Sequence, residues 1–555
     1  MEGRGQVLGQ AIELEGDAHR ADADIAALQA VSAADVQRVA RQYLTDDRRM
    51  VILYHAGPEP IPVGGRSPPV AAAPTPPVAE VAAPAAAPAP PAERQPPPPP
   101  GPPVQAALPA PAERTLPNGL KVIVARSTDI PLVTAVLNIG AGGADDPKAL
   151  AGLADMTASL LSRGAAGRTA EEVAQAVEGL GGALQAGATW DGSQVGVTVL
   201  ADKLGAALPI LADIARRPTL SPQELEIQRR QSLDDLTVEL QEPGAIARYA
   251  AQVAVFAGGP YGHVLGGTPA SLGRITAADV RAFHDAWYRP DDAVLVLAGD
   301  IDPERGFALA EQAFGDWTAP AAPPPAAPTA PPASAAAPRV IVVDLPGAGQ
   351  ASVTVAEPAI RRADPRYYQA VVANTVLGGG YSARLNAEIR IKRGLSYGAD
   401  SSLDARREPG MVVASAQTRN EAAPQVVELM LDQLRQMGVA PAGADELEAR
   451  KTSLAGEYGR NLETTEGLAR TLSAYAVLDI APSEIGRYGP SVQAVTAGQA
   501  EAEAAALFDP ARADIVVAGD AKAFIPALKA KYPNLELIPA AELDLDSPSL
   551  RKPAG

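Results

Sequence analysis

The sequence predicts an α+β protein with two homologous domains, each an antiparallel-leaning sheet with helices packed on one face. One helix–strand segment occurs three times along the chain, and the elements before its second and third copies follow in the same order. Two stretches rich in proline and alanine also divide the chain between these copies. A duplicated domain joined by spacers accounts for both observations.

The repeated segment begins at Val31, Ile275 and Val495 and reads VSAADVQRVARQYLTDDRRMVILYHAG, ITAADVRAFHDAWYRPDDAVLVLAGD and VTAGQAEAEAAALFDPARADIVVAGD. Each copy combines a Ser or Thr N-cap, a helix, a break marked by Asp or Pro, and a β-branched strand. The second and third copies are a domain length apart, which is typical of domain duplication. The first copy lies too near residue 1 to close a domain of its own. Residues 1–56 are therefore predicted to be the tail remnant of a preceding domain of the same kind.

Proline marks the domain boundaries. The chain has 54 prolines among its 555 residues, including the run QPPPPPGPP. Proline- and alanine-rich stretches form extended spacers rather than helices or ladders. The predicted organisation is a remnant at 1–56, a linker at 57–112, a first domain at 113–318, a linker at 319–338, a second domain at 339–542 and a flexible tail at 543–555.

Local signals place the elements of the first domain. TLPNGLKVIVAR predicts a hairpin with Asn118 and Gly119 in its turn, and LVTAVLNIGAGG predicts the next strand. Two helices follow, the second of which, TAEEVAQAVEGLGG, is capped by Thr169. ALQAGATWDGSQVGVTVL predicts two strands. Two long helices come next, the later one capped by Ser221 with Pro222 in its first turn, and they lead to the second copy of the repeat.

The second domain repeats this order. RVIVVDLP and ASVTVAEPAI predict strands, RYYQAVVANTVLGG predicts a helix, and SARLNAEIRIKRGLSYGADSSLDA runs from helix into strand. GMVVASAQT predicts a further strand, and two helices then precede the third copy.

Composition excludes several functions. The net charge of −18 and the lack of a basic patch argue against nucleic acid as a partner. No apolar run is long enough for a membrane span, and the first residues lack the apolar core of a signal peptide. The chain has no cysteine, which excludes disulfides and thiolate metal sites.

Several stretches together resemble the pitrilysin/insulinase family of zinc peptidases, which includes the mitochondrial processing peptidase subunits. They are TLPNGLKVIV, GAGGADDPKALAGLADM, TAEEVAQAVEGLGGALQA, SPQELEIQRRQSLDDL, PYGHVLGGTPASLGRIT, YRPDDAVLVLAGD and LGGGYSARLNAEIRIKRGLSYG. The resemblance implies that two homologous domains form one half of a clamshell, and that two halves enclose an extended peptide.

Active members of this family carry H-x-x-E-H, in which two His bind Zn²⁺ and the Glu activates water. The aligned segment GLADMTASL places Asp155 and Ser159 at the two His positions and Ala158 at the Glu position. The distal ligand position falls on Asp234 or its neighbour Asp235. These are degenerate zinc-motif positions, so we predict no catalytic residue, no metal and no cofactor in this chain, with zinc only in a catalytic partner.

Histidine offers no substitute site. The sequence has four His, at positions 19, 55, 263 and 284, and no two of them lie within one helical turn. Packing or a surface position is the favoured interpretation for His263 and His284.

The motif RGLSY places two candidate substrate-binding residues, Arg393 and Tyr397, where the resemblance implies that non-catalytic members contact peptide. A guanidinium and a phenol can both donate hydrogen bonds to a peptide carbonyl. The alternative is that Arg393 pairs with Glu388 and Tyr397 packs on the sheet. A glycine-rich rim is a further candidate contact with substrate, with a helix end followed by a turn as the alternative; its residues are Gly378, Gly379 and Gly380.

The sequence thus predicts a non-catalytic, substrate-binding half that complements a zinc-bearing half of the same family, either fused upstream in a longer natural chain or a separate subunit. Its expected partners are that catalytic half and an extended peptide. A structural subunit with no role in proteolysis and a stand-alone peptide-binding protein are the alternatives. The compartment stays open, although related tandem proteins resemble exported periplasmic enzymes.

Overall fold

The computed structural model describes residues 2–52, 110–326 and 337–552. The chain forms two compact units, Met1–Pro99 and Pro100–Gly555. The predicted linker at 57–112 lies almost entirely outside the described residues, and the described parts of 319–338 contain no helix or strand. Among the described helices, none is both long and apolar enough to cross a membrane.

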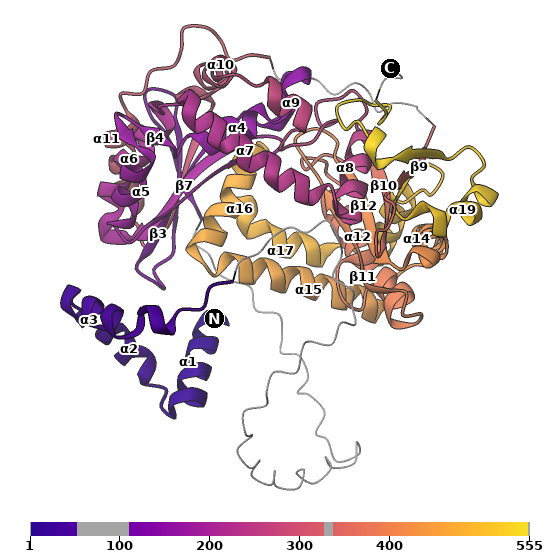
Figure 1. The fold of residues 1–555 in the computed structure, drawn as a ribbon, viewed down its shortest axis with the longest axis horizontal. Coiled ribbons are helices and arrows are strands. Elements are labelled where there is room, and N and C mark those ends of the chain that lie inside the picture. Colours follow the sequence, from indigo (N-terminus) through magenta and orange to yellow (C-terminus); the bar gives the residue numbers. More distant parts are fainter. Residues whose placement is uncertain (1, 53–109, 327–336, 553–555) are drawn as a thin grey trace. The chain divides into compact units, whose positions relative to one another are not determined.

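The first domain of the larger unit is built on a six-stranded sheet (Figure 1). The strand order is β1-β2-β8-β3-β7-β6, in which β2 and β8 run parallel and the other neighbours antiparallel. The strands are β1 (Ala112–Thr115), β2 (Lys121–Arg126), β3 (Leu132–Ile139), β6 (Ala183–Ala188), β7 (Ser193–Leu200) and β8 (Ala293–Gly299), with a small ribbon of β4 (Gly164–Ala165) and β5 (Arg168–Thr169). The helices are α4 (Leu153–Leu160), α5 (Ala170–Glu178), α6 (Leu204–Arg216), α7 (Pro222–Glu239), α8 (Pro243–Val255), α9 (Pro269–Arg274), α10 (Ala277–Trp287) and α11 (Pro303–Phe314).

The second domain has its own six-stranded sheet, in the order β11-β12-β10-β13-β9-β14. Here β9 runs parallel to both β13 and β14, and the other neighbours are antiparallel. The strands are β9 (Val340–Asp344), β10 (Ala351–Pro358), β11 (Ser396–Asp404), β12 (Met411–Thr418), β13 (Asp514–Gly519) and β14 (Glu536–Pro539). The helices are α12 (Tyr367–Gly378), α13 (Arg384–Asn386) with a π-helical turn (Ala387–Ile391), α14 (Ala423–Met437), α15 (Ala444–Leu462), α16 (Thr465–Val477), α17 (Glu484–Ala494), α18 (Ala497–Leu507) and α19 (Ile525–Lys531).

The two sheets share one topology. The order β2-β8-β3-β7-β6 in the first sheet recurs as β9-β13-β10-β12-β11 in the second, and β1 and β14 are added at the equivalent edge. The α+β class with two homologous domains is therefore confirmed. The second and third copies of the repeat form α10 with β8 and α18 with β13, as their sequences predict.

Local sequence signals explain where the elements begin and turn. Gly119 has φ +96° in the β1–β2 hairpin, a conformation that favours glycine, and the Asn118 amide donates to the carbonyls of Phe314 and Trp317. Thr169 and Ser221 accept hydrogen bonds from backbone N–H groups and so cap α5 and α7.

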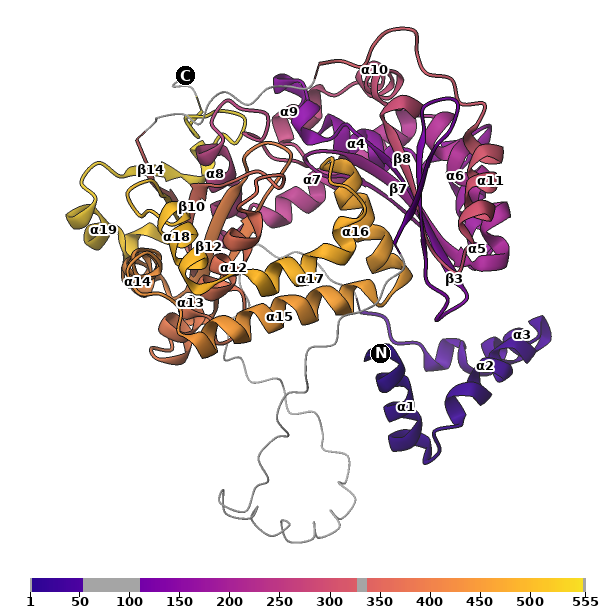
Figure 2. The same cartoon turned by 180° about the vertical axis from the view of Figure 1, so that it is seen from behind.

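Each sheet is covered on both faces, which the sequence did not predict. On one face lie the domain's own helices, and their apolar side chains form one core per domain. On the other face lies a helix from the other domain, α16 on the first sheet and α8 on the second (Figures 1 and 2). We call α8 and α16 the exchanged helices.

The strands show this double burial residue by residue. Val122 and Val124 of β2 face the first domain's own helices, whereas Ile123 and Ala125 face α16. Successive side chains of a strand point to opposite faces, so a strand buried on both sides reads as a continuous apolar run. The runs KVIVA and AVLVLAG of this chain have that character.

The segment after β14 corrects the expectation of a flexible tail. Leu545 and Leu550 are buried in the core beneath α8, and Asp546 accepts a hydrogen bond from Thr268 in the first domain. Arg551 donates to the carbonyl of Leu537 at 2.6 Å. Residues 543–552 are therefore fastened to both domains, because two leucines supply apolar anchors that composition alone did not reveal.

The smaller unit contains helices α1 (Glu2–Glu15), α2 (Arg20–Ala30) and α3 (Ala33–Tyr43), followed by a short 3-10 turn at Asp46–Arg48. The sequence predicted a strand after this turn. The described residues 49–52 are not in a strand, and the rest of that segment lies outside the described residues. No described strand of this unit offers an edge for pairing, which a strand requires.

Candidate functional site

Helix α4 carries the three degenerate zinc-motif positions. Its N-cap is Gly152, whose φ of +91° and close approach to the backbone of Gly267 leave no room for a side chain. Ala158 is fully buried, whereas Asp155 and Ser159 are half-buried. The residue predicted to stand at the catalytic Glu position, Ala158, thus presents only a buried methyl group.

A cavity of about 760 Å³ lies beside α4. Side chains from the end of α4, from β6 and from α7 line it: Ser159, Ser162, Arg163, Leu184, Gln185, Ala186, Gln228, Gln231, Asp234 and Asp235. The structure therefore brings Ser159 together with both distal-ligand candidates, Asp234 and Asp235, around one space.

The cavity wall is polar, and some of its side chains are hydrogen-bonded to one another. Arg163 donates to the amide oxygens of Gln228 and Gln231 at 3.2 and 3.3 Å. The sequence did not single out these three residues. For the two glutamines the signal was their helical spacing from Asp235, which puts Gln228, Gln231 and Asp235 on one face of α7; Arg163 carried no such signal.

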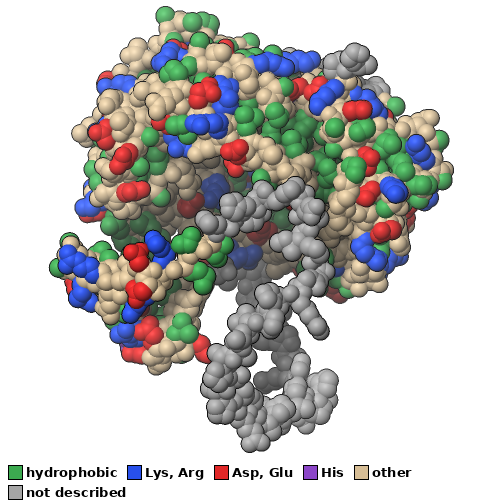
Figure 3. Space-filling model, viewed as in Figure 1, with side chains coloured by type: hydrophobic (Ala, Val, Ile, Leu, Met, Phe, Trp, Pro, Cys, Tyr) green, Lys and Arg blue, Asp and Glu red, His purple; other side chains and the backbone are tan. Residues whose placement is uncertain are grey.

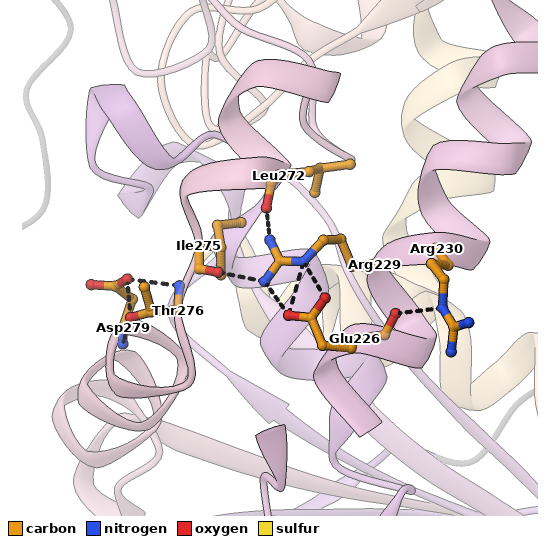
Figure 4. Close-up of polar contacts among 7 residues, drawn as sticks. All are labelled: Glu226, Arg229, Arg230, Leu272, Ile275, Thr276 and Asp279. Carbon is orange, nitrogen blue, oxygen red and sulfur yellow. Dashed lines mark hydrogen bonds and ion pairs between the residues drawn. The ribbon is translucent and has the colours of Figure 1, made fainter. Parts of the chain in front are cut away.

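Helix α7 is held in place from its other side (Figure 4). Arg229 donates to the carbonyl of Ile275 at 2.7 Å and to the carbonyl of Leu272, and it pairs with Glu226 at 3.0 Å. These carbonyls lie where α9 meets the N-cap of α10, so the second copy of the repeat anchors the helix that carries the cavity residues.

The donor groups do not fit a zinc site. Burial raises the pKa of the Asp155 carboxyl, although the backbone N–H of Ala188 opposes this. Carboxylates and a hydroxyl suit hard cations, whereas zinc sites are built with imidazole or thiolate. Within residues 2–52, 110–326 and 337–552, no group of three or more His, Cys, Asp or Glu side chains is arranged to hold a metal ion. Ala158 has no group that could accept a proton from water.

Strand β6 lies beside this cavity at the end of the first sheet, where β7 is its one neighbour among the described strands. Its side chains are half-buried or exposed along its whole length. An edge strand presents unpaired backbone N–H and C=O groups that an extended peptide can meet.

Arg393 and Tyr397 lie around the start of β11, the edge strand of the second sheet. The Arg393 guanidinium pairs with Glu388 and donates to its backbone carbonyl at 3.0 Å. Glu388 also accepts from Lys392 at 2.7 Å, and these hydrogen bonds lower the pKa of its carboxyl. The ion pair considered as an alternative for Arg393 is therefore present.

Tyr397 does not pack on the sheet. Its side chain is 87% exposed, and it sits where the pairing of β11 with β12 shifts register between Ser396 and Ala399. Such a bulge re-aims a side chain and is common next to functional sites. The phenol is free to meet a partner from outside the described chain.

The glycine rim divides into two parts. A Cβ on Gly378 would come within 2.2 Å of the backbone nitrogen of Ser401, so this glycine allows α12 to end against β11. Gly379 and Gly380 are exposed. The alternative, a helix end followed by a turn, is present, because α12 ends at Gly378 with Gly379 as its C-cap; a contact of Gly379 and Gly380 with substrate stays a prediction.

The two histidines of the larger unit pack against neighbouring groups. His284 is buried, its Nε2 donates to the carbonyl of Ala215 at 2.9 Å, and burial lowers its pKa. His263 packs edge-on against Trp190, with its Nε2 3.5 Å from the Asp146 carboxylate. His19 flanks α2 in the smaller unit, and His55 lies outside the described residues.

Comparison with known proteins agrees with this architecture. Residues 121–268 match the family described as Insulinase (Peptidase family M16), and residues 274–454 match the Peptidase M16 inactive domain. An uncharacterized zinc protease of Mycobacterium tuberculosis is 28% identical over 360 residues, which cover 64% of this chain and 82% of the relative. The mitochondrial-processing peptidase subunit alpha of Neurospora crassa is 28% identical over 219 residues, or 38% of this chain and 37% of that protein.

A solved structure extends the match to both domains. The crystal structure of a peptidase M16 inactive domain from Pseudomonas fluorescens superposes with a TM-score of 0.69 at 27% identity, and the match covers 74% of this chain and 98% of that one. These matches show that the chain belongs to the M16 (insulinase-like) peptidase family. Its sequence does not contain the H-x-x-E-H motif.

Proposed function

We propose that this protein is a non-catalytic, substrate-binding half of an M16 peptidase, which works with a zinc-bearing half of the same family. The observation that carries the proposal is the cavity beside α4, the helix on which the positions aligned with the zinc motif hold Asp155, Ala158 and Ser159; of these, Ser159 lines the cavity. A chamber wall is kept while the reactive groups are replaced.

The edge strand β6 supports a role in holding peptide. An extended segment added to β6 would pass the mouth of the cavity, where Gln185 and Gln231 offer amide donors and acceptors. Main-chain hydrogen bonds bind peptides of many sequences, which suits a half that holds substrate for another subunit.

Arg393 and Tyr397 supply donors at the second edge strand. The phenol is already exposed, whereas the guanidinium must share its hydrogen bonds between Glu388 and a peptide carbonyl. Arg has five N–H donors, so the ion pair can orient the guanidinium and leave other donors for substrate. If these donors lie beside the scissile bond of a peptide bound at the partner's catalytic site, they would polarise the carbonyl that is attacked.

The match to a subunit of the mitochondrial processing peptidase favours a paired M16 protein as the partner. The catalytic half would supply the metal and the base, and this chain would contribute binding and orientation. The other possibilities, a structural subunit or a stand-alone peptide-binding protein, predict no change in turnover when this chain is altered.

The test combines this chain with an M16 partner that carries H-x-x-E-H and follows the cleavage of a quenched fluorescent peptide. Arg393→Ala with Tyr397→Phe should lower turnover by roughly 10-fold or more, because donors to a developing oxyanion are lost. Complex formation on a sizing column should stay unchanged.

Arg435→Ala is the matched control, since this arginine is also exposed and ion-paired, with Asp432 on α14. Unchanged turnover in the double variant, or an equal loss in the control, would reject the proposal. Metal analysis of the purified chain should find no bound zinc; one equivalent of zinc with chelator-sensitive cleavage by this chain alone would also reject it.

A further inference from the structure

The smaller unit repeats a specific part of the second domain. Helices α2 and α3 have the lengths of α17 and α18, with the same two-residue connection between them. Helix α1 precedes them as α16 precedes α17. The unit is therefore a second version of the α16–α18 segment, outside the two domains that this chain completes.

The three copies of the repeat begin in the same way. Ser32, Thr276 and Thr496 each form a capping box with the residue three positions later, Asp35, Asp279 and Gln499. Because the caps match, positions along the three helices can be compared one by one.

Five equivalent positions differ sharply in exposure. In the second and third copies the side chains are at most 8% exposed, whereas in the first copy they are 42 to 83% exposed. The exposed set, here called the α3 face, is Val31, Val36, Val39, Tyr43 and Leu44. Its buried counterparts are Ile275, Val280, Phe283, Trp287 and Tyr288 in the second copy, and Val495, Ala500, Glu503, Leu507 and Phe508 in the third.

The buried counterparts show what covers such a face. Helix α10 packs on α4 in the first domain, and α18 packs on α12 in the second. Each covering helix holds the copy of the repeat that belongs to its own domain. The space-filling view shows hydrophobic side chains at the surface of the smaller unit (Figure 3).

We propose that the α3 face docks on the α12-type helix of a third M16 domain, one that lies outside this sequence and has no copy of its own. The helix before the first copy has 11 residues, as in the third copy, whereas the helix before the second copy, α9, has six, and this points to a C-terminal-type domain as the partner. Exposed apolar side chains gathered on one helix face mark an interaction site.

The test is site-specific photo-cross-linking in the cells that make the protein, with p-benzoylphenylalanine in place of Val39 in the full chain. The cross-linked peptide, identified by mass spectrometry, should come from an M16 domain outside residues 1–555 and align with Tyr367–Gly378. The same group in place of Arg41, an exposed residue on the polar side of α3, is the control and should cross-link at least 10-fold less.

A cross-link into a second copy of this chain, into a protein of another family, or of equal yield from both positions would overturn the proposal, as would no cross-link at all. Val36→Asp with Val39→Asp should abolish the association while the larger unit stays folded. The inference does not depend on peptide binding, so Arg393→Ala with Tyr397→Phe should leave the cross-link intact.

Discussion

Helix α16 covers the first sheet with large side chains, whereas helix α8 covers the second sheet mainly with alanines. Leu468, Leu472 and Tyr475 of α16 are buried, and on α8 the buried positions include Ala247 and Ala250. Both helices cover the sheet of the other domain, but α16 does so with large side chains, whereas the small side chains of α8 let the helix lie close to the sheet. Equivalent positions in the two domains should therefore differ in what they tolerate.

Polar groups sharpen the difference between the two sheets. Thr134 donates to Thr465 of α16 at 3.2 Å, and Asn138 donates to Ser473 at 3.1 Å. In the second domain, Glu357 of β10 is fully buried on the sheet face that packs against that domain's own helices. The strand registers make Glu357 equivalent to Ile139 of β3 in the first domain.

The largest effect is expected where bulk fills the interface. Leu472→Ala removes a fully buried side chain of α16 and should lower the free energy of unfolding by about 2–5 kcal/mol. Chemical denaturation measures this loss. Arg470→Ala, at an exposed site on the same helix, should change it by less than about 0.5 kcal/mol. Equal losses in the two variants would mean that the large buried side chains of α16 stabilise the protein no more than its exposed ones.

The second effect depends on pH. Burial raises the pKa of Glu357 to about 8, while the N–H of Asp509 and the Arg512 charge oppose it. The folded state then binds more protons than the unfolded state, so stability should fall as pH rises from about 5 to 8, by up to roughly 1.4 kcal/mol per pH unit. Glu357→Gln keeps an acceptor for the Asp509 N–H and should remove this slope.

Denaturation curves at pH 5, 6.5, 8 and 9 test this expectation. The free energy of unfolding of Glu357→Gln, relative to that of the native chain, should rise with each step up to about pH 8 and level off above it. Parallel pH profiles for the two proteins would show that the carboxyl is already neutralised by another route.

The smallest effect is expected where the helix lies close to the sheet. Ala250→Leu adds bulk to α8 at a fully buried position and should cost about 1–3 kcal/mol through overpacking. Arg248→Leu, on the exposed side of the same helix, is the control and should cost less. A stabilised Ala250→Leu variant would mean that a void lies beneath α8.

Much of the fold could be predicted from local signals. The Asn118-Gly119 turn, the caps at Thr169 and Ser221 and the repeated helix–strand units depend on neighbouring residues, so sequence reveals them. The exchange of α8 and α16 could not be predicted, because an apolar helix face does not say which sheet it will cover. The burial of residues 543–552 was missed for the same reason.

The candidate site divides along the same line. The positions of Asp155, Ala158 and Ser159 on one helix follow from a short motif. The cavity does not, because α4, β6 and α7 meet only after folding. The exposure of Tyr397 depends on a β-bulge, which shifts one residue against the partner strand without a reliable mark in the sequence.

The exchange of helices also determines how long one face of the first sheet stays uncovered during synthesis. Ile123, Ala125, Val296 and Ala298 leave the ribosome well before α16, the helix that covers them. At ~5–20 residues per second, the first sheet would wait roughly 8 to 35 s with one apolar face uncovered. A nascent chain held at β8 should therefore be a better chaperone client than one held after α17, although both have completed the strands of the first domain.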